Sequence, residues 1–332
     1  MKSVKEKKYL GNIISDNGAN LNNIKDVSNK ATGTINKIMT ALSERPYGRH
    51  MFKAAKVMRE AMLVGGMLTN SEGWINITKK DIELLEKPDT ILLRKLLSNS
   101  GNPSKCFMHL ELGIIPVKYV IMQKRMNFLH YLLKEDTESM ISKVFCALEA
   151  DSRRGDFIAL TNIDRNELNI LETNEEIKSF SKFTWKKYIR EKVKMCALKH
   201  LNEENQSKEK TKSIEFNELT MSHYLAENKK TELSKTIFSV RSKTLDLKHW
   251  LPWLYENDTC IACDKYVETM DHFMSCTAYE TQSFVDWKEI NGDNTEQIMK
   301  IGKVVEKRHT ERQKILAGRA AATDSTAPGL HG

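Results

Sequence analysis

Hydrophobic positions recur at helical spacing over much of the first 135 residues. The apolar residues that follow Leu21 lie three or four positions apart, on one face of a helix: Ile24, Val27, Ala31, Ile35, Ile38 and Leu42. Similar spacing predicts further helices over residues 48–68 and 116–133. Another helix should begin at Thr78, where Asp81 replaces the usual glutamate of a capping box. We therefore predict a helical bundle over residues 21–135.

Two features modify this helical pattern. The opening KKYLGNIISDNG combines β-forming residues with a turn at Ser15-Asp16-Asn17-Gly18, so a short β element is predicted within residues 1–20. Pro88 falls inside the helix that begins at Thr78. Proline lacks the N–H that the helix ladder needs, so we expect this helix to be kinked or divided.

The rest of the chain divides by composition. Residues 136–254 are polar and rich in lysine, with helix-like segments near 175–201 and 224–239, which predicts a basic helical linker. Residues 255–280 contain a cluster of cysteines. Residues 281–332 end in LAGRAAATDSTAPGLHG, which has too few large apolar side chains to order itself. The predicted fold is mainly α, with a partly disordered tail.

Charge and hydropathy narrow the functional classes. The 52 Lys and Arg residues exceed the 44 Asp and Glu residues, which gives a net charge of +8 and a pI near 9.0. This balance favours an acidic partner, although any one basic run can also be a solvated helix face. No stretch has the roughly 18 uninterrupted apolar residues of a membrane-spanning helix, and the start lacks the apolar core of a secretory signal. We therefore expect an intracellular protein of the nucleus or cytoplasm, with no membrane partner.

Four residues that can bind a metal lie close together in CIACDKYVETMDHFMSC. Cys260 and Cys263 form a C-x2-C pair, and His272 and Cys276 follow as H-x3-C. A C-x2-C pair directs two thiolates at one ion, and residues four apart on a helical turn share a face. In a reducing compartment such thiols bind metal rather than form disulfides. The spacing predicts a Zn²⁺ site, and the competing interpretation is a chance group of reduced cysteines beside a surface histidine.

The predicted zinc is structural rather than catalytic. Four protein ligands complete a tetrahedral site and leave no open position for a reactive water. The other cysteines stand singly in helical contexts, where small buried hydrophobic residues are more frequent than nucleophiles. They are Cys106, Cys146 and Cys196.

Several segments, taken in order, resemble the C-terminal third of a non-LTR (LINE-type) retrotransposon reverse transcriptase. The resemblance covers roughly residues 5–280 and rests on the following segments, which precede the Cys-Cys-His-Cys unit: KYLGNIIS (8–15), SEGW (71–74), HLELGIIPVKYVIMQKRMNFLHYLL (109–133) and SVRSKTLDL (239–247). It implies the end of a polymerase palm, a helical thumb, a linker and a CCHC zinc knuckle. It also implies binding of template RNA or target DNA, with the rest of a reverse transcriptase as a possible partner.

The chain departs from this family in its catalytic residues. An RNA-directed DNA polymerase uses paired aspartates to hold two magnesium ions, and the sequence contains no Asp-Asp pair. The segment after the cysteines is also too short and too poor in carboxylates for an endonuclease. We therefore expect a transposable-element fragment that has no polymerase or nuclease activity on its own.

Basic residues near the linker are the candidate nucleic-acid contacts, because lysine and arginine bind phosphates. They are Lys186, Lys187, Arg190, Arg241, Lys243 and Lys248. If the segments 182–194 and 235–249 lie on one side with the knuckle, they form a single groove. Trp185 and Tyr188 could stack on bases, but helix core is the more frequent role for such residues. The alternative to nucleic-acid binding is a zinc-stabilised helical protein-interaction module.

Overall fold

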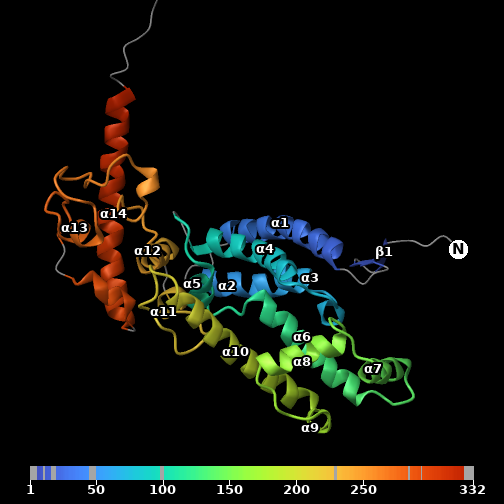
Figure 1. Cartoon of the computed structure of the whole chain (residues 1–332). Helices are drawn as coiled ribbons and strands as arrows, with labels where there is room; N and C mark the ends of the chain where they lie inside the picture. The colour runs from blue at the N-terminus through green and yellow to red at the C-terminus, as the bar shows by residue number, and fades with distance from the viewer. Residues whose placement is uncertain are drawn as a thin grey trace, which may run out of the picture.

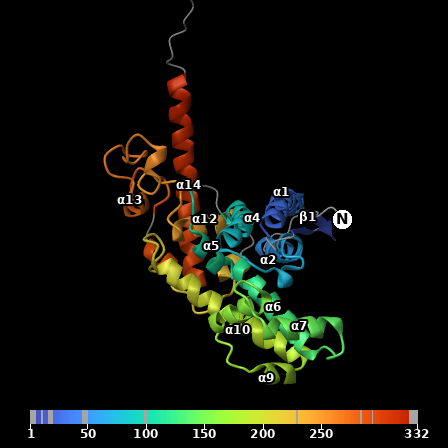
Figure 2. The same ribbon diagram turned by 45° about the vertical axis from the view of Figure 1, so that its right-hand side comes forward.

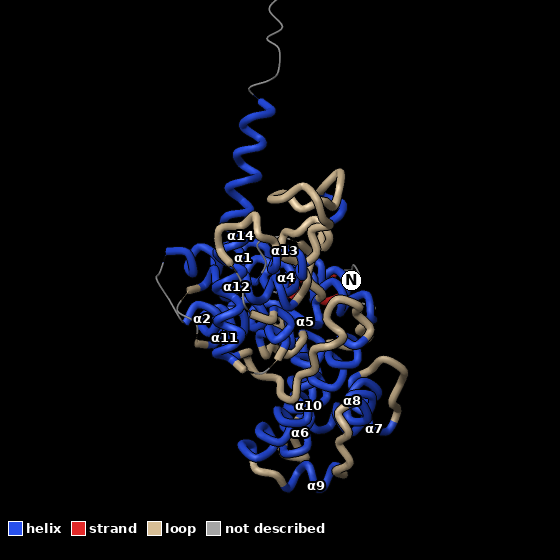
Figure 3. Tube along the Cα trace, turned by 90° about the vertical axis from the view of Figure 1, so that its left-hand side faces the viewer, coloured by secondary structure: helices blue, strands red, loops and turns tan. Residues whose placement is uncertain are grey.

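The chain is mainly helical, as predicted (Figures 1 and 3). The structure is a computed structural model, and the residues that it describes are 6–9, 12–15, 20–44, 50–97, 101–227, 230–282, 285–292 and 294–324. Within these ranges, no helix is both long and apolar enough to cross a lipid bilayer.

The first half of the chain forms a β-hairpin and most of a helical bundle. Its elements are β1 (Glu6–Tyr9), β2 (Asn12–Ser15), α1 (Leu21–Glu44), α2 (Met51–Met58), the π-helical segment η2 (Arg59–Val64), α3 (Gly65–Met67), the 3-10 turn η3 (Ser71–Gly73), α4 (Lys79–Leu97), α5 (Lys105–Leu112) and α6 (Val117–Lys134).

The second half consists of helices and short 3-10 turns. Its elements are α7 (Met140–Ala150), α8 (Phe157–Glu167), α9 (Asn174–Ser179), α10 (Lys182–Gln206), α11 (His223–Ala226), α12 (Thr231–Arg241), η4 (Pro252–Leu254), α13 (Met270–Ser275), η5 (Trp287–Asn291) and α14 (Thr295–Asp324).

At the N-terminus, two short strands occupy the segment that the sequence predicted as one. Strands β1 and β2 pair antiparallel, with Glu6 opposite Ser15 and Tyr9 opposite Asn12. Apart from Ser15, the turn predicted at residues 15–18 lies outside the described residues.

Helix α4 follows its predicted start, and of the two outcomes predicted at Pro88, a kink or a division, it does not show the division. Thr78 and Asp81 form the expected capping box, in which the Thr78 N–H donates to the Asp81 carboxylate and the Asp81 N–H donates to Thr78 Oγ1. The helix then continues through Pro88 without division. Proline leaves the carbonyl of Leu84 without its usual helical donor, and Ser28 Oγ of α1 donates to that carbonyl at 3.2 Å. A neighbouring helix thus replaces the missing hydrogen bond.

Two hydrophobic cores organise the helices, whose arrangement Figure 2 shows from a second direction. The first core combines α1, α2, α4 and α5 with α12, α13 and α14, so it contains side chains from the segments predicted as 21–135, 136–254 and 255–280. The second core lies mainly between α6, α8 and α10, with α7 and α9 at its edge. Helix α5 contributes side chains to both cores and connects them.

Helix α14 occupies much of the segment 281–332, which the sequence predicted as a partly disordered tail. Residues 295–324 form one helix, which runs beside α12 and α13 in Figure 1. Its buried residues Ile298, Ile301 and Val305 enter the first core. At Gly302 an added Cβ would lie 2.5 Å from Ile237 Cγ1 of α12, so the two helices pack unusually closely. Tertiary packing therefore orders a segment whose composition is polar, while residues 325–332 lie outside the described part.

Candidate functional site

The four metal-ligating residues predicted from the sequence lie together in the structure. Cys260 Sγ is 4.0 Å from Cys276 Sγ, and Cys263 Sγ is 3.3 Å from His272 Nε2. All four ligand atoms lie within 4.8 Å of one another. Cys260 and Cys276 are buried, whereas Cys263 and His272 are half-buried. This arrangement can hold one metal ion.

Two short backbone motifs present these ligands. The Asp264 N–H donates to the Cys260 carbonyl at 2.9 Å and closes a tight turn, and Asp264 has φ +53°, which aspartate tolerates better than most residues. On the other side, Thr269 caps α13 by accepting from the His272 N–H. The Cys276 N–H donates to the His272 carbonyl at 2.7 Å. His272 and Cys276 therefore lie one helical turn apart, as their spacing predicted.

Two arginines of α14 hold the backbone that carries the ligands. Arg308 Nη1 donates to the carbonyl oxygens of Phe273 and Cys276. Arg312 donates from Nε and Nη2 to the two carboxylate oxygens of Glu268, at 3.0 and 2.8 Å. Both arginines and Glu268 are fully buried. A buried bidentate pair of this kind fixes geometry, because moving either partner would leave a buried charge uncompensated.

Arg308 and Arg312 were not among the residues predicted from the sequence, although a signal for them exists. The buried residues of α14 continue one series at spacings of three and four: Ile298, Ile301, Val305, Arg308 and Arg312. The arginines occupy positions where the helical pattern calls for apolar side chains. An interrupted apolar series that continues in arginine can thus indicate buried ion pairs.

The thiols differ in how readily they ionise. Burial raises the pKa of Cys260 to about 12. Burial acts in the same direction at Cys263, but hydrogen bonds from the backbone N–H groups of Lys265 and Tyr266 leave its pKa lowered. Burial lowers the pKa of His272, which favours the neutral imidazole that binds metals. The Cys260 thiolate needs a nearby cation for charge compensation, and a bound metal ion would supply it.

Three of the predicted nucleic-acid contacts lie on the exposed side of α10. Lys186, Lys187 and Arg190 are exposed, as is Lys182 one turn earlier, and we call these four residues the basic stripe. Within the part of the chain that the structure describes, none of the four forms an ion pair. The neighbouring face of α10 is buried in the second core through Trp185, Ile189, Val193, Ala197 and Leu201.

The aromatic residues of this segment belong to the core. Trp185 is fully buried, stacks on the ring of His130 and donates from Nε1 to the Met126 carbonyl at 3.1 Å. Tyr188 is half-buried, and its hydroxyl donates to the Glu172 carboxylate at 2.6 Å. The interpretation of both residues as helix core is confirmed.

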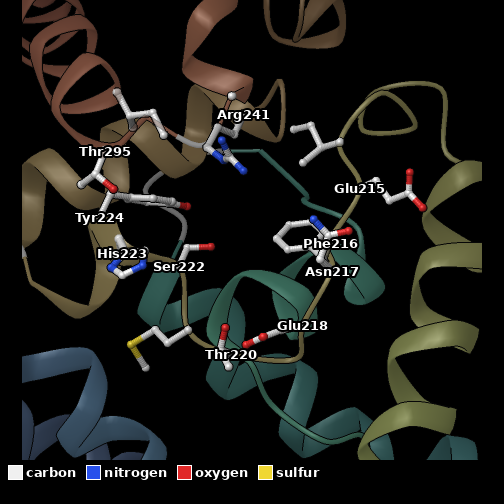
Figure 4. A pocket seen from close by; sticks show the side chains of 14 residues that line it. Glu215, Phe216, Asn217, Glu218, Thr220, Ser222, His223, Tyr224, Arg241 and Thr295 are labelled. Atoms are coloured by element: carbon white, nitrogen blue, oxygen red, sulfur yellow. The ribbon is translucent and has the colours of Figure 1, made fainter.

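Arg241 corrects the sequence analysis, because it does not lie on an exposed surface. Its Nε donates to Glu111 Oε1 at 2.7 Å, and its Nη1 donates to the Ile290 carbonyl. Figure 4 shows Arg241 in the wall of a cavity of about 360 Å³, near Ser222 and Tyr224. Ser222 Oγ donates to the other oxygen of the Glu111 carboxylate. The guanidinium is buried against a carboxylate and is not available as a phosphate contact.

Lys243 and Lys248 are half-buried. Lys243 has φ +51°, and its carbonyl accepts a hydrogen bond from Lys210 Nζ. The Lys248 ammonium donates to Asn257 Oδ1 at 2.8 Å. The segment 235–249 therefore does not present a basic face like that of α10. Of the two segments predicted to form a single groove, only 182–194 exposes a row of cations.

Comparison of the chain with models of known protein families, with curated proteins and with solved structures finds no match in any of the three.

Proposed function

We propose that this protein binds the phosphate backbone of nucleic acid along the basic stripe of α10. The observation that supports this function is a row of exposed cations that have no carboxylate partner among the described residues. Lys182, Lys186 and Arg190 are each four residues apart, so neighbouring side chains are about 6 Å apart along the helix axis. This is roughly two nucleotide steps along one strand of a B-form duplex. Contacts of this kind give affinity with little sequence preference.

We further propose that the metal is zinc and that its role is structural. In a tetrahedral site with Zn–S bonds of about 2.3 Å and Zn–N bonds of about 2.0 Å, ligand atoms are roughly 3.5–3.8 Å apart. The distances of 3.3 Å for Cys263–His272 and 4.0 Å for Cys260–Cys276 lie on either side of that range. Bound zinc would join the Cys260 turn to α13.

The segment order supports a proposal about origin. The short β element, the helical bundle, the basic helix and the Cys-Cys-His-Cys unit follow one another as in the C-terminal part of a non-LTR retrotransposon reverse transcriptase. On this proposal the chain holds template RNA or target DNA and depends on other polypeptide for any polymerase activity. Primer extension with magnesium on a poly(A) template, which should give no product above background, tests the last point.

The test of nucleic-acid binding compares two triple variants. Lys182→Ala/Lys186→Ala/Lys187→Ala removes most of the basic stripe. The control, Lys143→Ala/Lys199→Ala/Lys208→Ala, removes three lysines that each lie within 4.0 Å of a glutamate. Fluorescence anisotropy with single-stranded RNA and DNA at two salt concentrations measures affinity and its salt dependence.

Each lost phosphate contact should reduce the salt slope by about 0.7 on single strands, so the stripe variant should lose roughly two units. RNA and DNA binding should weaken alike. The control should match the wild type. Equal affinity and equal slope for the stripe variant and the wild type would show that α10 is not the binding surface.

The metal is tested separately by elemental analysis of protein purified without chelator. We expect one zinc per chain in the wild type and in Cys146→Ser, whose thiol is exposed and outside the cluster. Cys263→Ser should lose most of the metal. Absence of zinc from the wild type would contradict the structural-zinc proposal.

A specific observation favours the alternative, a zinc-stabilised protein-interaction module. Helix α7 exposes three apolar side chains, Met140, Ile141 and Val144, with exposed fractions of 76%, 46% and 52%. Apolar groups on one exposed helix face often contact another protein. If the wild type binds no nucleic acid at physiological salt, and Met140→Ser/Val144→Ser abolishes capture of a protein partner, this alternative replaces our proposal.

A further inference from the structure

A cleft of about 590 Å³ separates the helix that contains η2 from the middle of α10. It is lined by Lys56, Arg59, Glu60 and Val64 of α2 and η2, and by Arg190 and Lys194 of α10. Segment 219–221, Gly113 at the end of α5, Ile115 just before α6, and Val120 and Gln123 of α6 complete the lining. Because Arg190 also belongs to the basic stripe, the cleft lies directly beside the proposed nucleic-acid surface.

The charge of this cleft is positive and only partly compensated. Arg59 is neutralised by Asp89, to which it donates two hydrogen bonds of 2.6 and 2.7 Å. Lys56, Arg190 and Lys194 then supply three positive charges against the single charge of Glu60, which leaves +2. Glu191, outside the lining, lies 3.7 Å from Lys194, an exposed pair of small energetic value.

Burial and the neighbouring positive charges lower the pKa of Lys56. Burial lowers its pKa, and although Glu60 acts in the opposite direction, the charges of Arg59 and Lys194 lower it further. Its ammonium donates to the Gly113 carbonyl at 2.5 Å and keeps two more N–H groups for other acceptors. An anion in the cleft would relieve the repulsion among these cations.

The backbone around the cleft is built for close approach. Gly113 ends α5 with φ +59°, and a Cβ there would lie 2.3 Å from the carbonyl carbon of Thr220. Only glycine allows segment 219–221 to cross α5 at this distance. Arg59, Glu60 and Val64 of the lining belong to η2, a π-helical segment, and such segments are frequent at functional sites. Two independent backbone features thus shape the same cleft.

We propose that this cleft binds a phosphate group of the nucleic-acid strand that follows the basic stripe, with Lys56, Arg190 and Lys194 as its ligands. The proposal rests on the function proposed above and adds a defined site to it. A phosphate fits this chemistry because arginine and lysine donate charge-assisted hydrogen bonds to its several oxygens. The stripe leads into the cleft through Arg190. The group is either an internal phosphodiester or a terminal phosphate, whose charge near −2 would balance the cleft.

The test uses the full chain with Lys56→Gln/Lys194→Gln, a double variant that leaves Lys182, Lys186 and Lys187 in place. The control is Lys199→Ala/Lys208→Ala, which removes two cations on or just after α10 that have their own glutamates. The probes are a single-stranded 12-mer with a 5′-hydroxyl, the same 12-mer with a 5′-phosphate, and inorganic pyrophosphate. Anisotropy is measured for the oligonucleotides and calorimetry for pyrophosphate.

Loss of two of the three ligands of one phosphate should weaken binding about tenfold and reduce the salt slope by about 0.7 on single strands. An equal loss for both oligonucleotides identifies an internal phosphate. A wild-type preference for the 5′-phosphate that disappears in the cleft variant identifies a terminal phosphate. Pyrophosphate should bind the wild type and the control more tightly than the cleft variant.

Other results separate the two proposals. If the stripe variant loses oligonucleotide binding while the cleft variant matches the wild type, the cleft proposal is overturned and the proposed function stands. If the wild type binds pyrophosphate through Lys56 and Lys194 but binds no oligonucleotide, the nucleic-acid function is overturned. The cleft would then still be a phosphate site. Equally tight binding of an oligoglutamate peptide, dependent on the same two lysines, would show that the cleft recognises acidic protein instead.

Discussion

Two basic segments of similar composition differ sharply in what they present to solvent. Segment 182–194 places its apolar side chains on one face of α10 and leaves the basic stripe exposed. Segment 235–249 begins in α12, which packs against α4, α11, α14 and η5, and its Arg241 is buried against Glu111. A run of cations therefore does not define a basic surface. The number of helix faces that find packing partners decides whether the charges reach solvent.

The buried arginines differ from these exposed cations in that each has a buried partner. Arg59, Arg241 and Arg312 are each paired with a carboxylate that is also buried: Asp89, Glu111 and Glu268 respectively. Such pairs connect elements that are far apart in the sequence, and breaking one costs far more than removing an exposed cation. Four predictions test this contrast.

Removing the metal should have the largest effect on stability. Of the two basic segments, it should destabilise 235–249 and leave 182–194 folded. Structural zinc contributes roughly 10–16 kcal/mol in small finger peptides. In Cys263→Ser we expect α13 and α14 to lose protection from hydrogen exchange, and α12 to follow because α14 covers it. Residues 182–194 should keep their protection. Equal loss of hydrogen-exchange protection in both segments would show that the two cores unfold together. The two segments would then not differ in how they depend on the metal.

Arg241→Ala should destabilise the fold by about 3–5 kcal/mol, because it leaves the Glu111 carboxylate buried without its cation. Lys186→Ala should change the free energy of unfolding by less than about 0.5 kcal/mol. Urea denaturation of both variants gives the comparison. The double variant Arg241→Met/Glu111→Leu should recover much of the loss. A small effect of Arg241→Ala alone would mean that this segment is more open than its packing indicates.

The pH dependence of stability should reveal His109, which lies beside the Arg59–Asp89 pair. Burial lowers the pKa of His109 to about 4, although the Asp89 charge acts in the opposite direction. Below its ordinary pKa of about 6.5 the unfolded chain binds the proton first, so the free energy of unfolding falls between pH 6.5 and 4. The full difference corresponds to about 3 kcal/mol.

Urea unfolding of the wild type at pH 7.5 and pH 5.0 measures this change. The difference between the two pH values should shrink in His109→Gln and remain in His223→Gln, because His223 is 75% exposed. Identical pH dependence of wild type and His109→Gln would contradict the neutral, buried state of His109.

The smallest expected effect concerns nucleic-acid binding by the second segment. Lys243→Ala/Lys248→Ala should change the salt slope of oligonucleotide binding by clearly less than the stripe variant does. The Lys248 ammonium already donates to Asn257, which reduces its availability for phosphate. A loss as large as that of the stripe variant would restore the groove predicted from the sequence.

Local pattern predicted the elements whose cause is local. The helices α1 and α6, the capping box at Thr78 and the Cys-His cluster all follow from spacing within a few turns of chain. All four residues of this cluster could be predicted because their geometry depends only on a tight turn and one helical turn. The helix is not divided at Pro88, and the replacement hydrogen bond comes from Ser28, which is distant in the sequence.

The remaining features depend on contacts between distant segments. Composition indicated a partly disordered tail, yet α14 is ordered by packing on α12 and by hydrogen bonds from Arg308 and Arg312. Arg241 was predicted to be a surface cation, but in the structure it is paired with the carboxylate of Glu111, 130 positions earlier. No local pattern specifies which distant carboxylate a given arginine meets.

The position of α14 at the end of the described chain has a consequence for biosynthesis. All four residues of the Cys-His cluster are translated before Arg308 and Arg312. Until these arginines follow, Glu268 lacks its cation and α12 lacks the helix that covers it. Chaperones that recognise exposed apolar surface have their opportunity then. A stop codon just before residue 295 would make that transient state permanent, so such a truncated product should aggregate or be degraded even when its metal site is intact.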